Sequence, residues 1–361
     1  MKSRFTGRGR LARKLVAVAL AASLAVPSFA NQLTAQAFVP STDYSLFGIS
    51  GLRGTGTGTI TVAGVTGTVT KAILVWHGLS NTAAAVARSA TIAGTTVAGA
   101  NVGLSSDNCW SQASSQAFFA DVTSVVTGNG SYALSSMRTA GTFDPNGASL
   151  LVFFNDGNGA NNRDVAVFLG NDSNQANSFD AAGWSATLGG INYSSGAATL
   201  GLIVSDGQNF GESATNTLTI NGTPVTYPLF QGASLPVAPG SSNSNGGLWD
   251  HASAAITSIL VPGANTLSVT GNPEGTSDCL SLVGAVFDLP GGAVVTPPVI
   301  VPPGTTPPVF VPPAPTVAVP TVSALGLGGM SLSAMLWGVY ALRNRRRDET
   351  SVVRGEADKQ G

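Results

Sequence analysis

Residues 147–169 read Gly-Ala-Ser-Leu-Leu-Val-Phe-Phe-Asn-Asp-Gly-Asn-Gly-Ala-Asn-Asn-Arg-Asp-Val-Ala-Val-Phe-Leu. Two short apolar runs, Leu150–Phe154 and Val165–Leu169, flank a segment rich in Gly and Asn. Each run has the length of a β-strand and is rich in β-branched or aromatic residues. The stretch shows no sustained helical periodicity. It therefore predicts two β-strands joined by a polar loop.

The same pattern extends over residues 31–289, with further runs at Ala72–Trp76 and Leu200–Val204. Asn-Gly pairs supply the positive φ angles of tight hairpin turns. They occur at 129–130, 146–147, 158–159, 221–222 and 245–246. The expected fold class is all-β, a Gly-, Ser- and Thr-rich β-sandwich or jelly roll.

Four blocks of sequence recur in one order within this body. The pairs are 72–76 with 198–204, 90–97 with 218–225, 121–135 with 255–269, and 148–154 with 280–287. Their spacing favours two related β-sandwich halves, residues 31–180 and 181–289. The alternative is a chance resemblance, because stretches rich in Gly, Thr and Val align easily.

Charged residues are few and unevenly distributed. The chain has 17 Lys and Arg and 18 Asp and Glu in 361 residues, whereas about a quarter of a soluble globular chain is charged. Residues 1–14 carry six bases and no acid, and residues 31–289 carry five bases and 14 acids. Such an acidic body lacks the positive surface of a nucleic-acid-binding protein, so no nucleic-acid partner is expected.

Residues 1–30 are typical of a signal peptide. A basic region precedes the charge-free run Leu15–Val26, which is too short to span a bilayer. Cleavage is expected after Ala30, and a retained anchoring helix is the alternative. The sequence thus predicts export.

Residues 290–320 form a Pro-rich linker with 11 of the 20 prolines of the chain. Repeated Pro pairs favour the extended polyproline II conformation, so the linker reaches about 95 Å. We expect it to act as a stalk.

A transmembrane helix is predicted within residues 321–347. Residues 322–342 carry no charge, and 21 helical residues span about 32 Å, the thickness of a hydrocarbon core. The Arg cluster that follows places the tail, 348–361, in the cytoplasm. A buried helix of a soluble domain is the alternative.

The segment Val319-Pro320-Thr321-Val322-Ser323-Ala324-Leu325-Gly326 resembles the IPTL-CTERM sorting signal. That signal combines Ile-Pro-Thr-Leu-x-x-Trp-Gly, a transmembrane helix and an Arg cluster. Pro320, Thr321 and Gly326 match it outright, while Leu325 departs from the Trp. The remaining matched positions are Val319 and Val322, which are conservative replacements, and the cluster Arg345, Arg346 and Arg347.

This resemblance covers residues 319–347 and implies two partners, the secretion machinery and an exosortase-type sorting enzyme. It implies an intermediate anchored in the inner membrane of a Gram-negative bacterium, followed by transfer of the body to the cell surface. A plain single-pass anchor is the alternative. The body, over residues 70–289, is loosely similar to uncharacterised β-sandwich modules of extracellular proteins, which implies surface display.

Cys109 and Cys279 are the only cysteines. An even number in an exported chain predicts a disulfide, and two free thiols are the alternative. His77 and His251 are the only histidines, and no His-x-His, His-Glu-x-x-His or Gly-x-Ser-x-Gly pattern occurs. We expect these histidines to be hydrogen-bonded beside aromatic rings, and we predict no enzyme activity, no cofactor and no metal site.

Two further features concern ligands. The loop 156–164 offers oxygen ligands at alternate positions, as Ca²⁺ requires, but Arg163 and the missing closing acid break the pattern. Trp110 and Trp249 lie in Ser- and Asn-rich loops and are the candidates for stacking on a surface polysaccharide. The sequence favours a structural or adhesive protein of the cell surface or matrix, with a lectin-like carbohydrate-binding module as the alternative.

Overall fold

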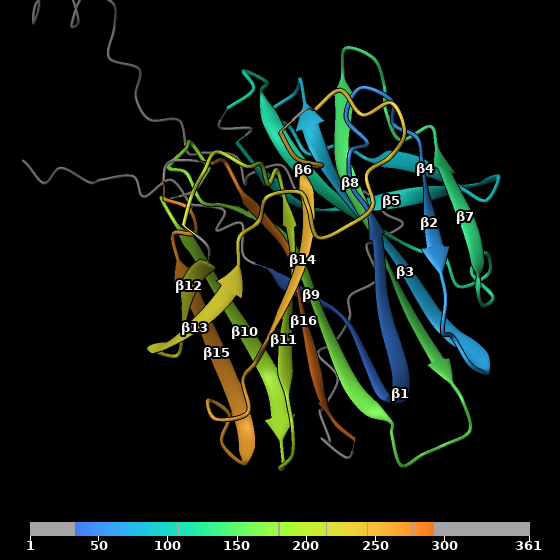
Figure 1. The fold of residues 1–361 in the computed structure, drawn as a ribbon, viewed down its shortest axis with the longest axis vertical. Helices are drawn as coiled ribbons and strands as arrows, with labels where there is room; N and C mark the ends of the chain where they lie inside the picture. Colours follow the sequence, from blue (N-terminus) through green and yellow to red (C-terminus); the bar gives the residue numbers. More distant parts are fainter. Residues whose placement is uncertain are drawn as a thin grey trace, which may run out of the picture. The chain divides into compact units, whose positions relative to one another are not determined.

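The computed structural model describes residues 33–106, 109–179, 181–213, 215–243, 245–275 and 278–291 (Figure 1). Every regular element in these residues is a β-strand, so the all-β prediction is confirmed. No helix in this part of the chain is long and apolar enough to cross a membrane. The predicted signal peptide, the linker beyond Gly291, the sorting signal and the tail lie outside the described residues.

Sixteen strands make up the body. They are β1 Thr34–Ile49, β2 Gly58–Val62, β3 Thr68–Ser80, β4 Arg88–Ile92, β5 Thr95–Ser105, β6 Ser114–Asp121, β7 Gly130–Ser135, β8 Phe143–Asn155, β9 Arg163–Ser173, β10 Trp184–Tyr193, β11 Thr199–Ser205, β12 Thr215–Ile220, β13 Thr223–Pro228, β14 Trp249–Ala255, β15 Gly263–Gly271 and β16 Ser281–Pro290.

Twelve of the strands form one curled sheet in the order β14-β11-β16-β9-β1-β8-β3-β6-β5-β4-β7-β2. The other four form a second sheet, β10-β15-β12-β13. Strand β1 lies at the centre of the large sheet and has two partners. Its first part, residues 34–42, pairs with β9, and residues 43–49 pair with β8. This one strand therefore joins the early and late parts of the chain.

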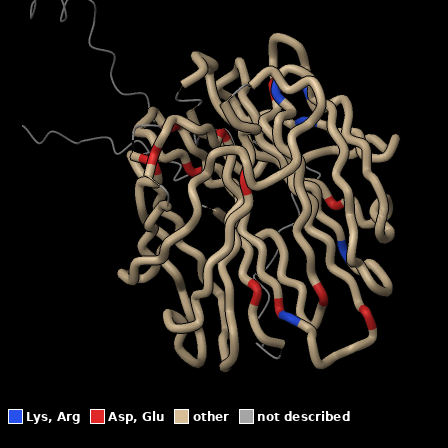
Figure 2. The backbone as a smooth tube through the Cα atoms, viewed as in Figure 1, with Lys and Arg blue, Asp and Glu red and all other residues tan. Residues whose placement is uncertain are grey.

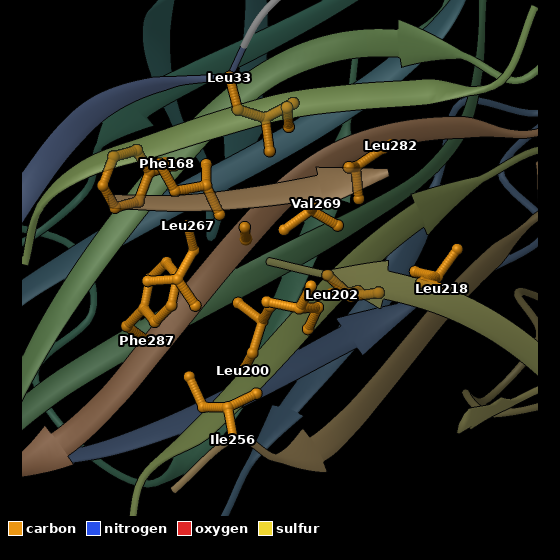
Figure 3. Packing of buried hydrophobic residues seen from close by; sticks show 14 of the residues in the cluster. Leu33, Phe168, Leu200, Leu202, Leu218, Ile256, Leu267, Val269, Leu282 and Phe287 are labelled. Atoms are coloured by element: carbon orange, nitrogen blue, oxygen red, sulfur yellow. The ribbon is translucent and has the colours of Figure 1, made fainter. Parts of the chain in front are cut away.

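The central strands are buried on both faces. Leu150 and Val152 of β8 point into one apolar core, with residues of β2, β4 and β7, whereas Leu151 and Phe153 point into a second core shared with β9 and β16. This is why the run Leu150–Phe154 is apolar without alternation, since each face of the strand meets another layer. A third core fills the space between β9, β16, β11 and the four-stranded sheet (Figure 3).

The pairing pattern of β1–β8 recurs in β9–β16. Among the first eight strands, β8 lies between β1 and β3, and β3 also pairs with β6. Among the last eight, β16 lies between β9 and β11 in the same way, and β11 also pairs with β14. Individual contacts recur as well. The N–H of Ala72 donates to Thr123 Oγ1 at 2.9 Å, and the N–H of Ala198 donates to Thr257 Oγ1 at 2.9 Å. Strand β9 lies within 31–180 and pairs with both β1 and β16, so in the recurring pattern it takes the place that β1 has among the first eight strands.

Charges are sparse along the described backbone (Figure 2). Each of the five basic residues of the body contacts a partner. The pairs are Arg53–Asp206, Lys71–Asp121, Arg138–Asp144, Arg163–Asp288 and Arg88 over the ring of Phe143. Arg53 and Asp206 are the buried pair among them.

Candidate functional site

A disulfide joins Cys109 and Cys279, whose Cα atoms are 6.3 Å apart, so this prediction is confirmed. Cys109 lies between β5 and β6, and Cys279 directly precedes β16. The bond spans a sequence separation of 170 residues. It therefore ties the first eight strands to the last eight.

The structure does not bring the two candidate sugar-binding tryptophans together. Trp249 opens β14 and is 0% exposed, and its indole N–H donates to Ser149 Oγ at 2.9 Å. Gly147 packs directly against Trp249. Even a Cβ atom added at Gly147 would lie only 2.4 Å from the Cβ of Trp249, so no space remains between them. A sugar cannot stack on a ring that is covered on all sides, so Trp249 is no longer part of the candidate site. Its polar sequence neighbours indicated exposure, but the ring packs between sheet layers.

Trp110 lies beside the disulfide and is half-buried. Its indole N–H donates to Asp206 Oδ2 at 2.8 Å, and the Arg53 guanidinium lies 4.0 Å from the ring centroid. Trp110 lines a cleft of about 330 Å³. The other polar residues of this cleft are Arg53, Gln112, Arg138, Thr142 and Asp144. The cleft therefore combines an aromatic ring with several hydrogen-bonding side chains.

Behind this cleft lies a buried polar network that the sequence analysis missed. Arg53 Nη2 donates to Asp206 Oδ1 at 2.8 Å, and Arg53 Nε donates to Asn146 Oδ1 at 3.1 Å. Asn146 Nδ2 donates to Ser205 Oγ at 2.9 Å, and this hydroxyl contacts His77 Nδ1 at 2.7 Å. The network links the first eight strands to β11. The sequence feature that could have indicated this network is the small number of basic residues. An Arg among so few bases is expected to pair with an acidic residue.

Both histidines are neutral. Burial, aided by the charge of Arg53, lowers the pKa of His77 to about 3, and burial lowers the pKa of His251 to about 3. His251 Nε2 contacts Ser149 Oγ at 2.6 Å, and the ring of His77 lies 6.5 Å from that of Trp249. Ser149 and Ser205 are fully buried. Their hydroxyls are therefore closed to a substrate, although a Ser–His contact is the first requirement of an activated nucleophile.

Both carboxylates of the loop 156–164 accept hydrogen bonds from protein groups. Asp156 Oδ1 accepts the N–H of Asn158, and Asp156 Oδ2 accepts a bond from Asn161 Nδ2. Asp164 Oδ1 accepts the N–H of Ser41 at 2.8 Å. Among the described residues, no group of three or more His, Cys, Asp or Glu side chains is placed to hold a metal ion.

Asp278 is buried beside the disulfide. Burial raises the pKa of its carboxyl to about 8, against a hydrogen bond from the N–H of Gln208, and the charge of Asp206 adds to the rise. Between its ordinary pKa of 3.8 and the raised pKa of about 8, the folded protein therefore keeps a proton that the unfolded chain has released. Stability contributed by this group is lost as the pH rises through that window.

Replacing Asp278 by Asn is expected to remove this pH dependence. In the unchanged protein this group makes the free energy of unfolding fall by about 1.4 kcal/mol per pH unit between the unfolded pKa of 3.8 and the folded pKa of about 8. Urea denaturation at a series of pH values from about 6 to 9 measures the slope. Asp156→Asn, in an exposed loop, is the matched control and should leave the slope unchanged. Equal slopes for Asp278→Asn and the unchanged protein would contradict the prediction.

A larger cleft, of about 640 Å³, lies between the second part of β1 and strands β11, β14 and β16. One wall consists of Tyr44–Phe47 of β1. The opposite side includes Thr199, Gly201, His251, Ser253 and Val286.

Comparison with known proteins adds no relative. No protein-family model matches the chain, and no curated protein is significantly similar to it.

Proposed function

We propose that this chain is an exported protein with a structural or adhesive role at the cell surface or in the extracellular matrix, sorted through the IPTL-like segment at 319–347. The disulfide Cys109–Cys279 carries the proposal, because disulfides persist in oxidising compartments outside the cytoplasm. The expected signal peptide and transmembrane helix predict the same route. The body also suits exposure to the medium, because the apolar side chains on both faces of the central strands are buried.

The intact mass of the protein from its host tests this route. We expect a mass that begins after Ala30 and ends near Thr321, with thiol labelling only after reduction. A mass that retains residues 322–361 would instead support a permanent inner-membrane anchor. Labelling without reduction would contradict the disulfide as the basis of the proposal.

A second candidate function is carbohydrate binding in the cleft beside Trp110. It is favoured by the half-buried indole and the surrounding polar side chains. A surface polysaccharide is the expected ligand class.

A glycan array tests this second function. We expect binding that is lost in Trp110→Ala and retained in Phe210→Ala, since Phe210 is exposed but lies outside the cleft. Trp110→Phe keeps an aromatic ring but removes the N–H that donates to Asp206, so it separates stacking from positioning. No binding across the array would favour the structural role.

We also propose that the two sets of eight strands descend from one ancestral unit. The recurring pairing pattern and the equivalent bonds of Ala72 and Ala198 support this. The junction would then fall between β8 and β9. A tightly folded protein from residues 31–160 alone would support the proposal, although β1 would lose its pairing with β9.

A further inference from the structure

The Asn-Gly pairs of the body are potential sites of chemical modification. They lie at 129–130, 146–147, 158–159, 221–222 and 245–246. The main-chain nitrogen that follows an Asn can attack the carbonyl carbon of the Asn side chain, and a Gly nitrogen does so most easily because no Cβ shields it or restricts its backbone. The reaction requires that the nitrogen and the side-chain amide are free to meet. The structure separates one pair from the other four on this ground.

Asn146-Gly147 is fixed inside β8. The Asn146 side chain is 0% exposed. Its Oδ1 accepts a hydrogen bond from Arg53 Nε at 3.1 Å, and its Nδ2 donates to Asp206 Oδ1 at 3.3 Å. The amide of Asn146 cannot turn toward the nitrogen of Gly147 without breaking this buried network.

Asn245-Gly246 is fixed through its main chain. The C=O of Asn245 accepts the N–H of Asn209 at 2.8 Å. A Cβ at Gly246 would lie 2.4 Å from the carbonyl oxygen of Gln231, so other main-chain segments enclose this glycine. The nitrogen of Gly246 therefore has no room to move.

Asn129 and Asn221 are exposed, but both ends of each amide are hydrogen-bonded. Asn129 Oδ1 accepts the N–H of Val65 at 2.9 Å, and Asn129 Nδ2 donates to the C=O of Val65 at 2.9 Å. Asn221 Oδ1 accepts the N–H of Ser268 at 2.8 Å, and its Nδ2 donates to the C=O of Thr266 at 3.3 Å. Exposure alone therefore does not free an amide.

Asn158-Gly159 differs from these four pairs. Both residues are exposed in the loop between β8 and β9. Among the described residues, neither Nδ2 of Asn158 nor the N–H of Gly159 has a hydrogen-bond partner. A Cβ at Gly159 would meet no heavy atom within 4 Å. The attacking nitrogen and the leaving amide group are thus both free.

We propose that Asn158 is a site of spontaneous deamidation. The nitrogen of Gly159 bonds to Cγ of Asn158 and releases its proton to water, while the bond from Cγ to Nδ2 breaks and Nδ2 leaves as ammonia. The product is a five-membered cyclic imide. Water then adds to either carbonyl of the imide and opens the ring, which gives aspartate or isoaspartate at position 158. Only water is consumed, so the reaction needs no enzyme or cofactor.

The N–H of Ala160 favours the first step. It donates to Oδ1 of Asn158 at 3.2 Å. This oxygen gains negative charge when the nitrogen of Gly159 adds to Cγ, and a donor aimed at a developing charge stabilises the transition state.

The product adds a carboxylate to a loop that already carries Asp156 and Asp164. Isoaspartate also lengthens the main chain at position 158 by one methylene. Residue 158 lies outside the strands, and Asp164 keeps its bond to the N–H of Ser41 at the end of the loop. The modified protein should therefore keep its fold.

Peptide mapping by mass spectrometry tests the proposal on the full chain, incubated folded at neutral and at mildly alkaline pH. Asn158 should convert at least about tenfold faster than each of the other four Asn residues, because these must first break hydrogen bonds or main-chain packing. Both aspartate and isoaspartate should form, and the rate should rise with pH because the attacking nitrogen loses a proton. In the reduced chain unfolded in urea, all five pairs should convert at comparable rates.

Gly159→Ala supplies the decisive variant. The added Cβ meets no neighbour, so the fold is kept, but it crowds the attacking nitrogen and should slow conversion of Asn158 about tenfold. Gly128→Ala is the matched control, because a Cβ there also meets nothing within 4 Å, and it should leave the rate at Asn158 unchanged.

Three results would overturn the proposal. One is equal conversion of Asn158 and Asn129 in the folded protein. Another is an unchanged rate in Gly159→Ala, since direct hydrolysis of the amide does not use the nitrogen of residue 159. The third is an intact Asn158 in the folded protein under conditions that convert it in the unfolded chain, because the loop would then hold this pair as firmly as the others.

Discussion

Replacing Arg53 by Met is expected to lower the free energy of unfolding by about 3–5 kcal/mol. The substitution leaves Asp206 as a buried carboxylate without its cation, and it also removes the donor to Asn146. Both partners are more than nine-tenths buried, so water cannot replace the lost contacts. Urea denaturation followed by tryptophan fluorescence measures the change.

Two further variants make this prediction specific. Lys71→Met breaks the exposed pair with Asp121 and should cost less than about 1 kcal/mol. Adding Asp206→Asn to Arg53→Met removes the orphaned charge, so the double variant should be more stable than Arg53→Met alone. An equal cost for Arg53→Met and Lys71→Met would show that the buried pair has no special weight.

Loss of the disulfide is the second large effect. The variant Cys109→Ser/Cys279→Ser is expected to lose about 5 kcal/mol in the chain-entropy model, because the bond closes a very long loop. The separation between the two cysteines is 170 residues. A loss of this size is a large part of the stability of an ordinary domain, about 5–15 kcal/mol. Thermal and urea denaturation of the variant and of the unchanged protein measure it.

Reduction supplies the control for this pair. A reductant should lower the stability of the unchanged protein to that of the double variant and leave the variant itself unaffected. If the unchanged protein and the double variant unfold at the same urea concentration without reductant, the disulfide does not constrain the unfolded chain.

Local patterns predicted the strands well where a strand or turn depends on its own residues. Asn221-Gly222 forms the predicted tight turn between β12 and β13, with φ angles of 48° and 78°. Asn146-Gly147 has the same two residues but lies inside β8, where the Asn side chain bonds Arg53. A buried partner distant in the sequence thus overrode the local preference of this pair.

The candidate site was predictable only in part. The disulfide between Cys109 and Cys279 follows from a count of cysteines. Trp110 lines the smaller cleft, and its role there stays a prediction. Trp249 was misplaced, because its exposure depends on Gly147 and Ser149 of β8 and not on its neighbours in the chain. Arg53 and Asp206 were missed for the same reason.

The amino-acid sequence by itself determined that the body is all-β, rich in turns and held by one disulfide, because strand length, turn residues and cysteine number are local or compositional properties. Only the tertiary structure decided which strands pair. Strand β1 bonds both β8 and β9, which lie about a hundred residues or more away along the chain. Sheet pairing joins residues that are distant in the chain, so its register depends on the packing of whole layers.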